Sequence, residues 1–175
     1  GANTTGTNNT ASGNYALLSN TTGSSNTAVG SFALDANTTA SNNTAVGYGS
    51  LGANTTGAEN VAVGREALLA NTTGAGNVAI GKDALDANTT ASNNVAIGLQ
   101  ALTANTTGDL NTAVGKSAGA SVTTGVQNTL IGALAGDSLS DADFNVAVGQ
   151  DALAIDSLGS RSVAIGRRSL YTQNF

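Results

Sequence analysis

Short aliphatic triplets recur along this chain every 17 residues, each preceded by a polar residue, nearly always asparagine, and followed by glycine. The clearest copies read NTAVG, NVAVG or NVAIG, and the copies start at residues 9, 26, 43, 60, 77, 94, 111, 128, 145 and 162. A second marker, Asn-Thr-Thr, starts at residues 3, 20, 37, 54, 71, 88 and 105. Because neither series contains an insertion or a deletion, each copy is predicted to occupy the same place in successive turns of one repetitive structure.

A unit of 17 residues is too short for a helix pair or a propeller blade, which need roughly 30 residues or more. It fits one coil of a β-solenoid, with a strand at the triplet and a tight turn at the glycine that follows. Numbering the opening asparagine as repeat position 1, we predict a second strand at the Ala-Leu-x-Ala segment (positions 8–11) and a second turn at Asn-Thr-Thr. No helical or heptad period is present. The sequence therefore predicts an all-β, parallel β-solenoid of ten 17-residue coils.

Alternation along the triplet predicts which side chains face the interior. We expect the aliphatic residue at position 4 to point inside with position 2, and the leucine at position 9 to be the largest buried side chain. The alanine at position 3 is then expected to point outward and to form a flat strip suited to close approach by another chain. The alanines of this predicted trimer interface are Ala28, Ala45, Ala62, Ala79, Ala96, Ala113, Ala147 and Ala164.

The repeated asparagines predict ladders along the axis of the solenoid. Equivalent asparagines in successive coils would stack at the strand spacing of about 4.7–4.8 Å. Side-chain amides at that spacing can hydrogen-bond from coil to coil.

Composition limits the interior and the possible chemistry. Aromatic residues make up 3% of the chain, and Pro, Cys, Met, Trp and His are absent, so the core must be thin and copies are expected to need partners. Without His or Cys the usual catalytic triads and most metal sites are excluded, and we expect no enzyme activity, no cofactor and no metal. A net charge of −5 offers no surface for nucleic acid, and no apolar run suits membrane insertion.

The strings NTAVG, NVAIG and SVAIG, followed two residues later by Ala or Ser, resemble the head repeats of trimeric autotransporter adhesins of the Yersinia adhesin A type. Similar repeats occur in phage tail-fibre proteins. The resemblance implies a left-handed β-roll, a parallel homotrimer, and extracellular display on a bacterial outer membrane or a virion tail fibre. It also implies that the chain binds an external ligand, either a host surface protein or a glycan.

The repeat departs from that family in its length, since the usual head repeat is shorter. It also decays toward the C-terminal end of the chain. We expect one β-roll domain over 1–175, with regular coils over 1–118 and irregular coils over 119–175, as a fragment of a longer fibre protein. The sequence leaves bacterial adhesin and phage fibre open, together with the ligand and the flanking domains.

Positions 6 and 7 vary most, so we expect them to face solvent. Tyr15, Phe32 and Tyr48 lie there and are the candidate ligand-binding residues, because exposed aromatic rings commonly anchor glycans or partner proteins. The alternative is that these three rings pack locally over the end of the roll.

Two other functions stay open on particular residues. Stacked threonines of the Asn-Thr-Thr marker could order water in an ice-binding solenoid, although only one threonine of each pair should face outward. A glycan-cleaving tailspike needs two close carboxylates, and Glu66 and Asp83 occupy equivalent places in adjacent coils. Asp35 and Asp86 lie three coils apart, which is too far.

Charged groups near the C-terminal end have simpler interpretations. Asp137, Asp141 and Asp143 fall in one irregular turn, with Asp156 one coil on, where a calcium ion is conceivable and a polar loop is the default. A basic cluster is expected to balance Asp151 and Asp156, or to bind an acidic glycan or a following stalk. Its members are Arg161, Arg167 and Arg168.

Overall fold

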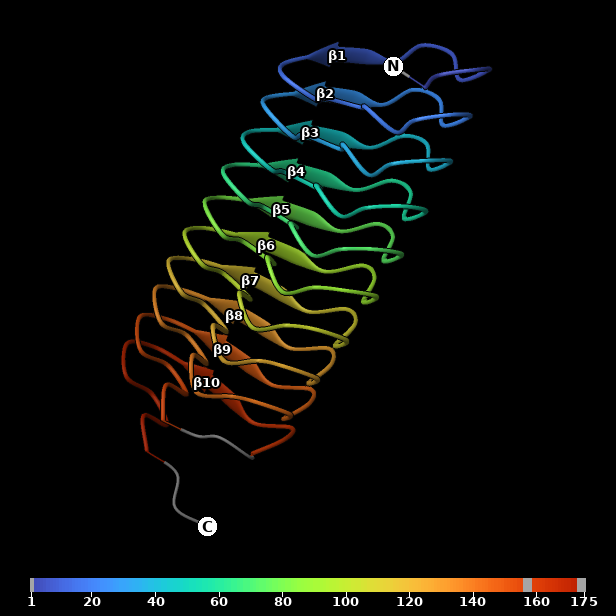
Figure 1. The fold of residues 1–175 in the computed structure, drawn as a ribbon. Coiled ribbons are helices and arrows are strands. Elements are labelled where there is room, and N and C mark those ends of the chain that lie inside the picture. Colours follow the sequence, from blue (N-terminus) through green and yellow to red (C-terminus); the bar gives the residue numbers. More distant parts are fainter. Residues whose placement is uncertain (1, 156–158, 173–175) are drawn as a thin grey trace.

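The computed structural model describes residues 2–155 and 159–172, and it contains ten short strands in one parallel sheet (Figure 1). The strands are β1 (Thr10–Ser12), β2 (Thr27–Val29), β3 (Thr44–Val46), β4 (Val61–Val63), β5 (Val78–Ile80), β6 (Val95–Ile97), β7 (Thr112–Val114), β8 (Thr129–Ile131), β9 (Val146–Val148) and β10 (Val163–Ile165). Each strand pairs with its equivalent in the next coil, so that Thr27 lies opposite Thr44 and Val29 opposite Val46. The described residues contain no helix. An all-β, parallel β-solenoid is thereby confirmed.

The side of each coil opposite the sheet is built from turns, and the predicted second strand is wrong. Ala33 and Leu34 are both fully buried, although successive side chains of a strand point to opposite faces. The backbone turns both side chains inward because Phe32 (φ 59°) and Leu34 (φ 50°) adopt left-handed conformations. Consecutive coils remain hydrogen-bonded on this side, as from the amide of Leu34 to the carbonyl of Ser50 (3.1 Å).

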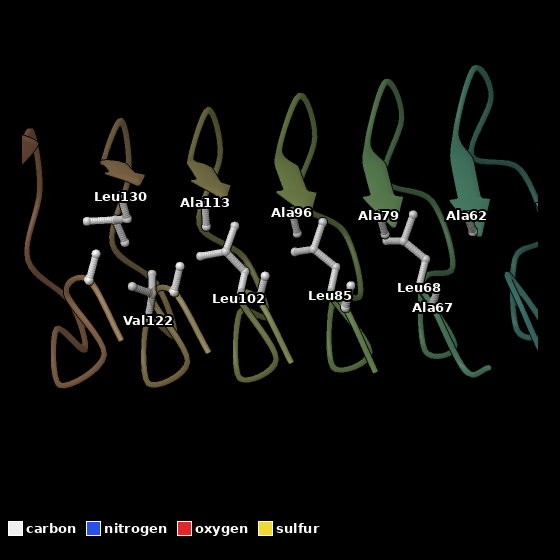
Figure 2. Close-up of a cluster of buried hydrophobic side chains, with 14 of the residues drawn as sticks. Ala62, Ala67, Leu68, Ala79, Leu85, Ala96, Leu102, Ala113, Val122 and Leu130 are labelled. Atoms are coloured by element: carbon white, nitrogen blue, oxygen red, sulfur yellow. The ribbon is translucent and has the colours of Figure 1, made fainter. Parts of the chain in front are cut away.

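The interior is filled by the alanines of position 3 and the leucines of position 9, which face each other across the coil (Figure 2). The predicted role of the leucines is confirmed, since Leu68 and Leu85 are fully buried. The prediction that position 4 points inside and position 3 outside is wrong, because Ile80 and Ile97 at position 4 are 39% and 37% exposed. A coil this narrow leaves room only for a methyl group opposite each leucine, so the smallest side chain of the triplet points inward.

The alanines predicted as a trimer interface are consequently core residues. None is more than 1% exposed within the single chain, so none is free to contact another copy. The residues concerned are Ala28, Ala45, Ala62, Ala79, Ala96, Ala113, Ala147 and Ala164.

Two neighbouring coils depart from this arrangement of small and large core residues. Leu130 replaces the alanine of β8 and is fully buried, whereas Gly119 and Gly136 stand where other coils have leucine. A Cβ atom added at Gly119 would lie 2.7 Å from Leu130 Cδ1, and one at Gly136 would lie 2.7 Å from Leu130 Cδ2. The Leu130 side chain, which is labelled in Figure 2, therefore fills the volume that two missing leucines leave.

Two ladders of buried asparagines run along the roll, as the repeats predict. At position 12, Asn37 Nδ2 donates to Asn20 Oδ1 (2.8 Å) and to the carbonyl of Ala40 (3.1 Å). At position 1, the backbone amide of Asn43 donates to Asn26 Oδ1 (3.0 Å). These bonds offset the cost of burying amide groups, which is large when they have no partner.

The position 12 ladder ends where the core reverses. Val122 follows Asn105 in the next coil, and Asn105 Oδ1 is buried without a hydrogen-bond partner. Past this point, Val122 and Leu139 continue the same row as fully buried apolar residues. The pairing of β8, β9 and β10 nevertheless keeps the register of the earlier coils.

The glycine after each strand is required by its contacts as well as by its conformation. Gly30 has φ 135°, a value that L side chains rarely adopt. A Cβ atom there would also lie 2.4 Å from the carbonyl oxygen of Gly47 in the next coil. The turn predicted at this glycine is confirmed.

Candidate interaction surfaces

The outward face of the sheet carries two straight rows of β-branched side chains. Position 4 contributes Val29, Val46, Val63, Ile80, Ile97, Val114, Ile131, Val148 and Ile165, and position 2 contributes threonine or valine from every strand. The strands β2 to β10 stack along the roll (Figure 1), and their pairing is in register throughout, so each row of side chains continues from one strand to the next. Neither row contains a charged residue. We name these two rows the aliphatic face.

Within the single chain the aliphatic face is in contact with solvent. Five of its nine position 4 side chains are exposed, among them Ile131 at 40% and Ile165, in the last described strand, at 71%, and the other four are partly exposed. A continuous apolar surface of this kind on a folded chain typically marks a site of interaction. Sequence reasoning missed this surface because it placed the valines and isoleucines inside.

The candidate ligand-binding aromatics come together on the turn side of the first coils. The rings of Tyr15 and Phe32 stack with centroids 5.2 Å apart and an interplanar angle of 26°. The rings of Phe32 and Tyr48 meet edge to face at 5.8 Å. Tyr15 and Tyr48 are 49% and 53% exposed, so their solvent exposure is confirmed. Local packing, the alternative, is also present, and binding of a ligand stays a prediction.

The two carboxylates considered for glycan cleavage are each held by a neighbouring cation. Arg65 Nη2 lies 2.8 Å from Glu66 Oε2, and Lys82 Nζ lies 2.9 Å from Asp83 Oδ2. The remaining oxygen of Asp83, Oδ1, is buried without a hydrogen-bond partner. Each carboxylate therefore has a local counter-ion, and glycan cleavage by this pair stays a prediction.

Asp35 and Asp86 lie on separate coils with different surroundings. Burial raises the pKa of the Asp35 carboxyl above its usual value. Asp86 Oδ1 instead accepts a hydrogen bond from Thr103 Oγ1 at 2.8 Å.

The acidic residues near the C-terminal end do not converge on one point. Asp143 Oδ1 accepts from the amide of Val126 (2.8 Å), and Asp141 Oδ1 accepts from Ser140 Oγ (2.9 Å). Burial raises the pKa of the Asp137 carboxyl, whereas Asp156 lies outside the described residues. No group of three or more acidic side chains over 2–155 and 159–172 is placed to hold a metal ion.

Two arginines of the predicted basic cluster, Arg161 and Arg168, have local partners. Arg168 Nε lies 3.4 Å from Asp151 Oδ2, which confirms one of the predicted charge pairs. The guanidinium of Arg168 also lies 5.5 Å from the ring centroid of Tyr171, and that of Arg161 lies 5.6 Å from that of Phe144. The predicted charge pairing of the basic cluster with Asp156 involves a residue outside the described ranges.

The threonines of the Asn-Thr-Thr marker divide between structure and solvent. The first donates its hydroxyl to a carbonyl of the next coil, as from Thr38 Oγ1 to Thr55 O (3.2 Å). The second is exposed, as at Thr39 and Thr56. Only one threonine of each pair therefore faces outward, as expected.

A cavity of about 290 Å³ lies at the open end of the first coil, and its lining belongs to the interior of the roll, namely Asn3, Asn9, Ala11, Ala16, Leu17 and Asn20. Among the residues that the structure describes, there is no helix long and apolar enough to span a bilayer. No protein-family model, curated protein or solved structure matches this chain.

Proposed function

We propose that this chain is a structural and receptor-binding segment of an extracellular trimeric fibre or adhesin, assembled through the aliphatic face. The observation that carries the proposal is the pair of uninterrupted β-branched rows along the sheet, exposed to water in the single chain. A rod-like roll with one apolar face along its length is suited to side-by-side packing with other rods.

The composition of the face favours a second copy of the same chain as its partner. A partner must match an apolar surface about ten coils long, with no charged residue in either row, and an identical roll does so along its whole length. The strands are three residues wide, so the face is narrow and suited to several copies meeting along one axis. The resemblance to adhesin head repeats supports three parallel copies wound as left-handed rolls.

This assembly leaves the turns of positions 6 and 7 free for a ligand. Tyr15, Phe32 and Tyr48 lie there as one aromatic cluster, which supports binding of a host glycan or surface protein. Display on a bacterial outer membrane and display on a virion tail fibre are both compatible with these features.

Charge placed on the aliphatic face tests the proposal. The double substitution Ile80→Glu with Ile97→Glu puts two carboxylates into the packed surface of each copy, and we expect light scattering to give the mass of one chain. The matched control is Thr90→Glu with Thr107→Glu, which adds the same charge to exposed turns of the same coils and should keep the wild-type assembly. An unchanged mass in the isoleucine variant would refute packing through this face.

A specific observation also favours a second candidate, an ice-binding solenoid. The rows of threonine, valine and isoleucine repeat at the strand spacing of about 4.8 Å on a parallel sheet that is in register throughout, a regular array suited to ordering water. The two functions compete for the same surface, because a face packed against other copies cannot contact ice. Thermal hysteresis by a monomer would support ice binding, whereas an assembled fibre segment should show none.

A further inference from the structure

Position 2 of the aliphatic face alternates between threonine and valine in blocks. Threonine occupies β1 to β3 and again β7 and β8, whereas valine occupies β4 to β6 and again β9 and β10. The row thus reads as Thr10, Thr27, Thr44, Val61, Val78, Val95, Thr112, Thr129, Val146 and Val163. Valine and threonine have nearly the same shape, so the blocks differ in hydroxyl groups and not in size.

These threonine hydroxyls have no partner within the chain. Over the described ranges, Thr27, Thr44, Thr112 and Thr129 make no side-chain hydrogen bond, whereas Thr38 of the turn row donates to the next coil. In water the free hydroxyls are solvated. If the face is covered by another copy, an unpaired hydroxyl loses its hydrogen bonds to water and destabilises the assembly, so each needs a partner from the neighbouring chain.

We infer that copies pack in register, so that the threonines of β2, β3, β7 and β8 hydrogen-bond with the same threonines of neighbouring copies and thereby fix the register of the assembly. This inference rests on the proposed packing through the aliphatic face. At every level of a parallel, unshifted assembly, threonine meets threonine and valine meets valine.

Other alignments leave hydroxyls against methyl groups. A shift of one coil sets threonine against valine at each block boundary, where β3 meets β4, β6 meets β7 and β8 meets β9. An antiparallel arrangement sets β1 against β10, β2 against β9 and β4 against β7, each a pair of threonine with valine. From β2 to β10 the other row of the face varies only between valine and isoleucine, so these hydroxyls are the polar groups of the face that distinguish one alignment from another.

Spin labels read the register directly, because the chain contains no cysteine. Thr39→Cys and Thr124→Cys place single labels on exposed turns five coils apart, away from the face. In a parallel, unshifted assembly each label lies at the same level in every copy, so both variants give the same single, narrow distribution of label-to-label distances. In an antiparallel one, at about 4.8 Å per coil, their axial offsets are about 34 Å for Thr39 and about 14 Å for Thr124.

The hydroxyls are then removed by the quadruple substitution Thr27→Val, Thr44→Val, Thr112→Val and Thr129→Val. Valine already occupies the same position in other coils, so the roll should fold and assemble, but distances shifted by about 4.8 Å or its multiples should appear. The matched control changes four exposed turn threonines to valine, at Thr22, Thr56, Thr73 and Thr107, and should keep the single narrow distance.

The outcomes separate this inference from the proposed function. An assembled wild type with one distance, together with an assembled quadruple variant with several, supports the inference. An assembled quadruple variant that keeps the single distance, or an antiparallel wild type, overturns the inference and leaves packing through the face intact. A monomeric wild type overturns both.

Discussion

The exchange of core volume around Leu130 gives the sharpest prediction about how the roll is held together. Leu130→Ala removes the side chain that fills the space beside Gly119 and Gly136. Neither glycine has a side chain that can move into the cavity. We therefore expect a loss of about 4 kcal/mol, in the upper part of the ~2–5 kcal/mol range for buried Leu→Ala changes.

The converse change, Gly136→Leu, should also destabilise the wild type. A Cβ atom there lies 2.7 Å from Leu130 Cδ2 and 2.8 Å from Leu139 Cδ1, so the core becomes overpacked, at a cost of about 1–3 kcal/mol. The backbone itself accepts leucine, because Gly136 (φ 59°) and the leucine of an ordinary coil, Leu34 (φ 50°), have nearly the same conformation.

The double variant Leu130→Ala with Gly136→Leu sets alanine opposite leucine as in an ordinary coil and removes the close contact with Leu130, while that with Leu139 remains. Its loss of stability should be smaller than the sum of the two single losses by about 2 kcal/mol. Urea unfolding of the four proteins at one fixed concentration measures this coupling. Leu51→Ala, five coils from Gly136, is the control and should combine with Gly136→Leu additively. Additive losses for Leu130 and Gly136 would refute the idea that they share one volume.

Three further predictions concern the ladder, an acidic group and the aromatic cluster. Asn71→Ala breaks bonds to Asn54 Oδ1 (2.9 Å) and Gly74 O (3.0 Å) and removes the acceptor of the next asparagine. Asn105→Ala, at the end of the ladder, should lower the free energy of unfolding by about 1 kcal/mol less than Asn71→Ala does, as measured by urea unfolding. Equal losses for the two variants would contradict a stabilising ladder. Burial raises the pKa of Asp137, so the folded state binds its proton more tightly, and this carboxyl should lower stability as pH rises through its raised pKa. Asp137→Asn should remove this pH dependence from the free energy of unfolding. A variant with the same pH dependence as the wild type would contradict the role of Asp137. Tyr48→Ala should weaken binding to receptor-bearing cells about tenfold or more while the free energy of unfolding stays the same. Binding equal to that of the wild type would exclude the aromatic cluster as the ligand-binding site.

The periodic features of the fold could be predicted from the sequence, because they depend only on spacing. The coil length, the parallel pairing, the turn at Gly30 and the asparagine ladder through Asn37 all follow from residues that repeat without interruption. Which side chains of the triplet face the interior could not be predicted correctly from the spacing. Alternation separates position 3 from positions 2 and 4, but hydrophobicity alone then favours valine and isoleucine inside, whereas the narrow coil admits only alanine.

The sequence did hold a signal for the correct direction. Where position 3 enlarges, at Leu130, position 9 shrinks from leucine to glycine in the same coil, at Gly136, and in the preceding coil, at Gly119. Two positions vary in this way, one larger where the other is smaller, when their side chains fill the same part of the core. Position 3 therefore had to face position 9. Similarly, Gly49 and Gly76 occur where other coils have left-handed residues, which indicated positive φ at those turns. The solvent exposure of Tyr15 and Tyr48 was predicted because variable positions of a strict repeat lie outside its shared structure.

The most direct test of the account is the mass of the wild-type protein in solution, measured by native mass spectrometry and light scattering across a range of concentrations. Packing through the aliphatic face predicts three times the 16.9 kDa mass of one chain, persisting on dilution. A stable, fully folded species of 16.9 kDa at every concentration would contradict it.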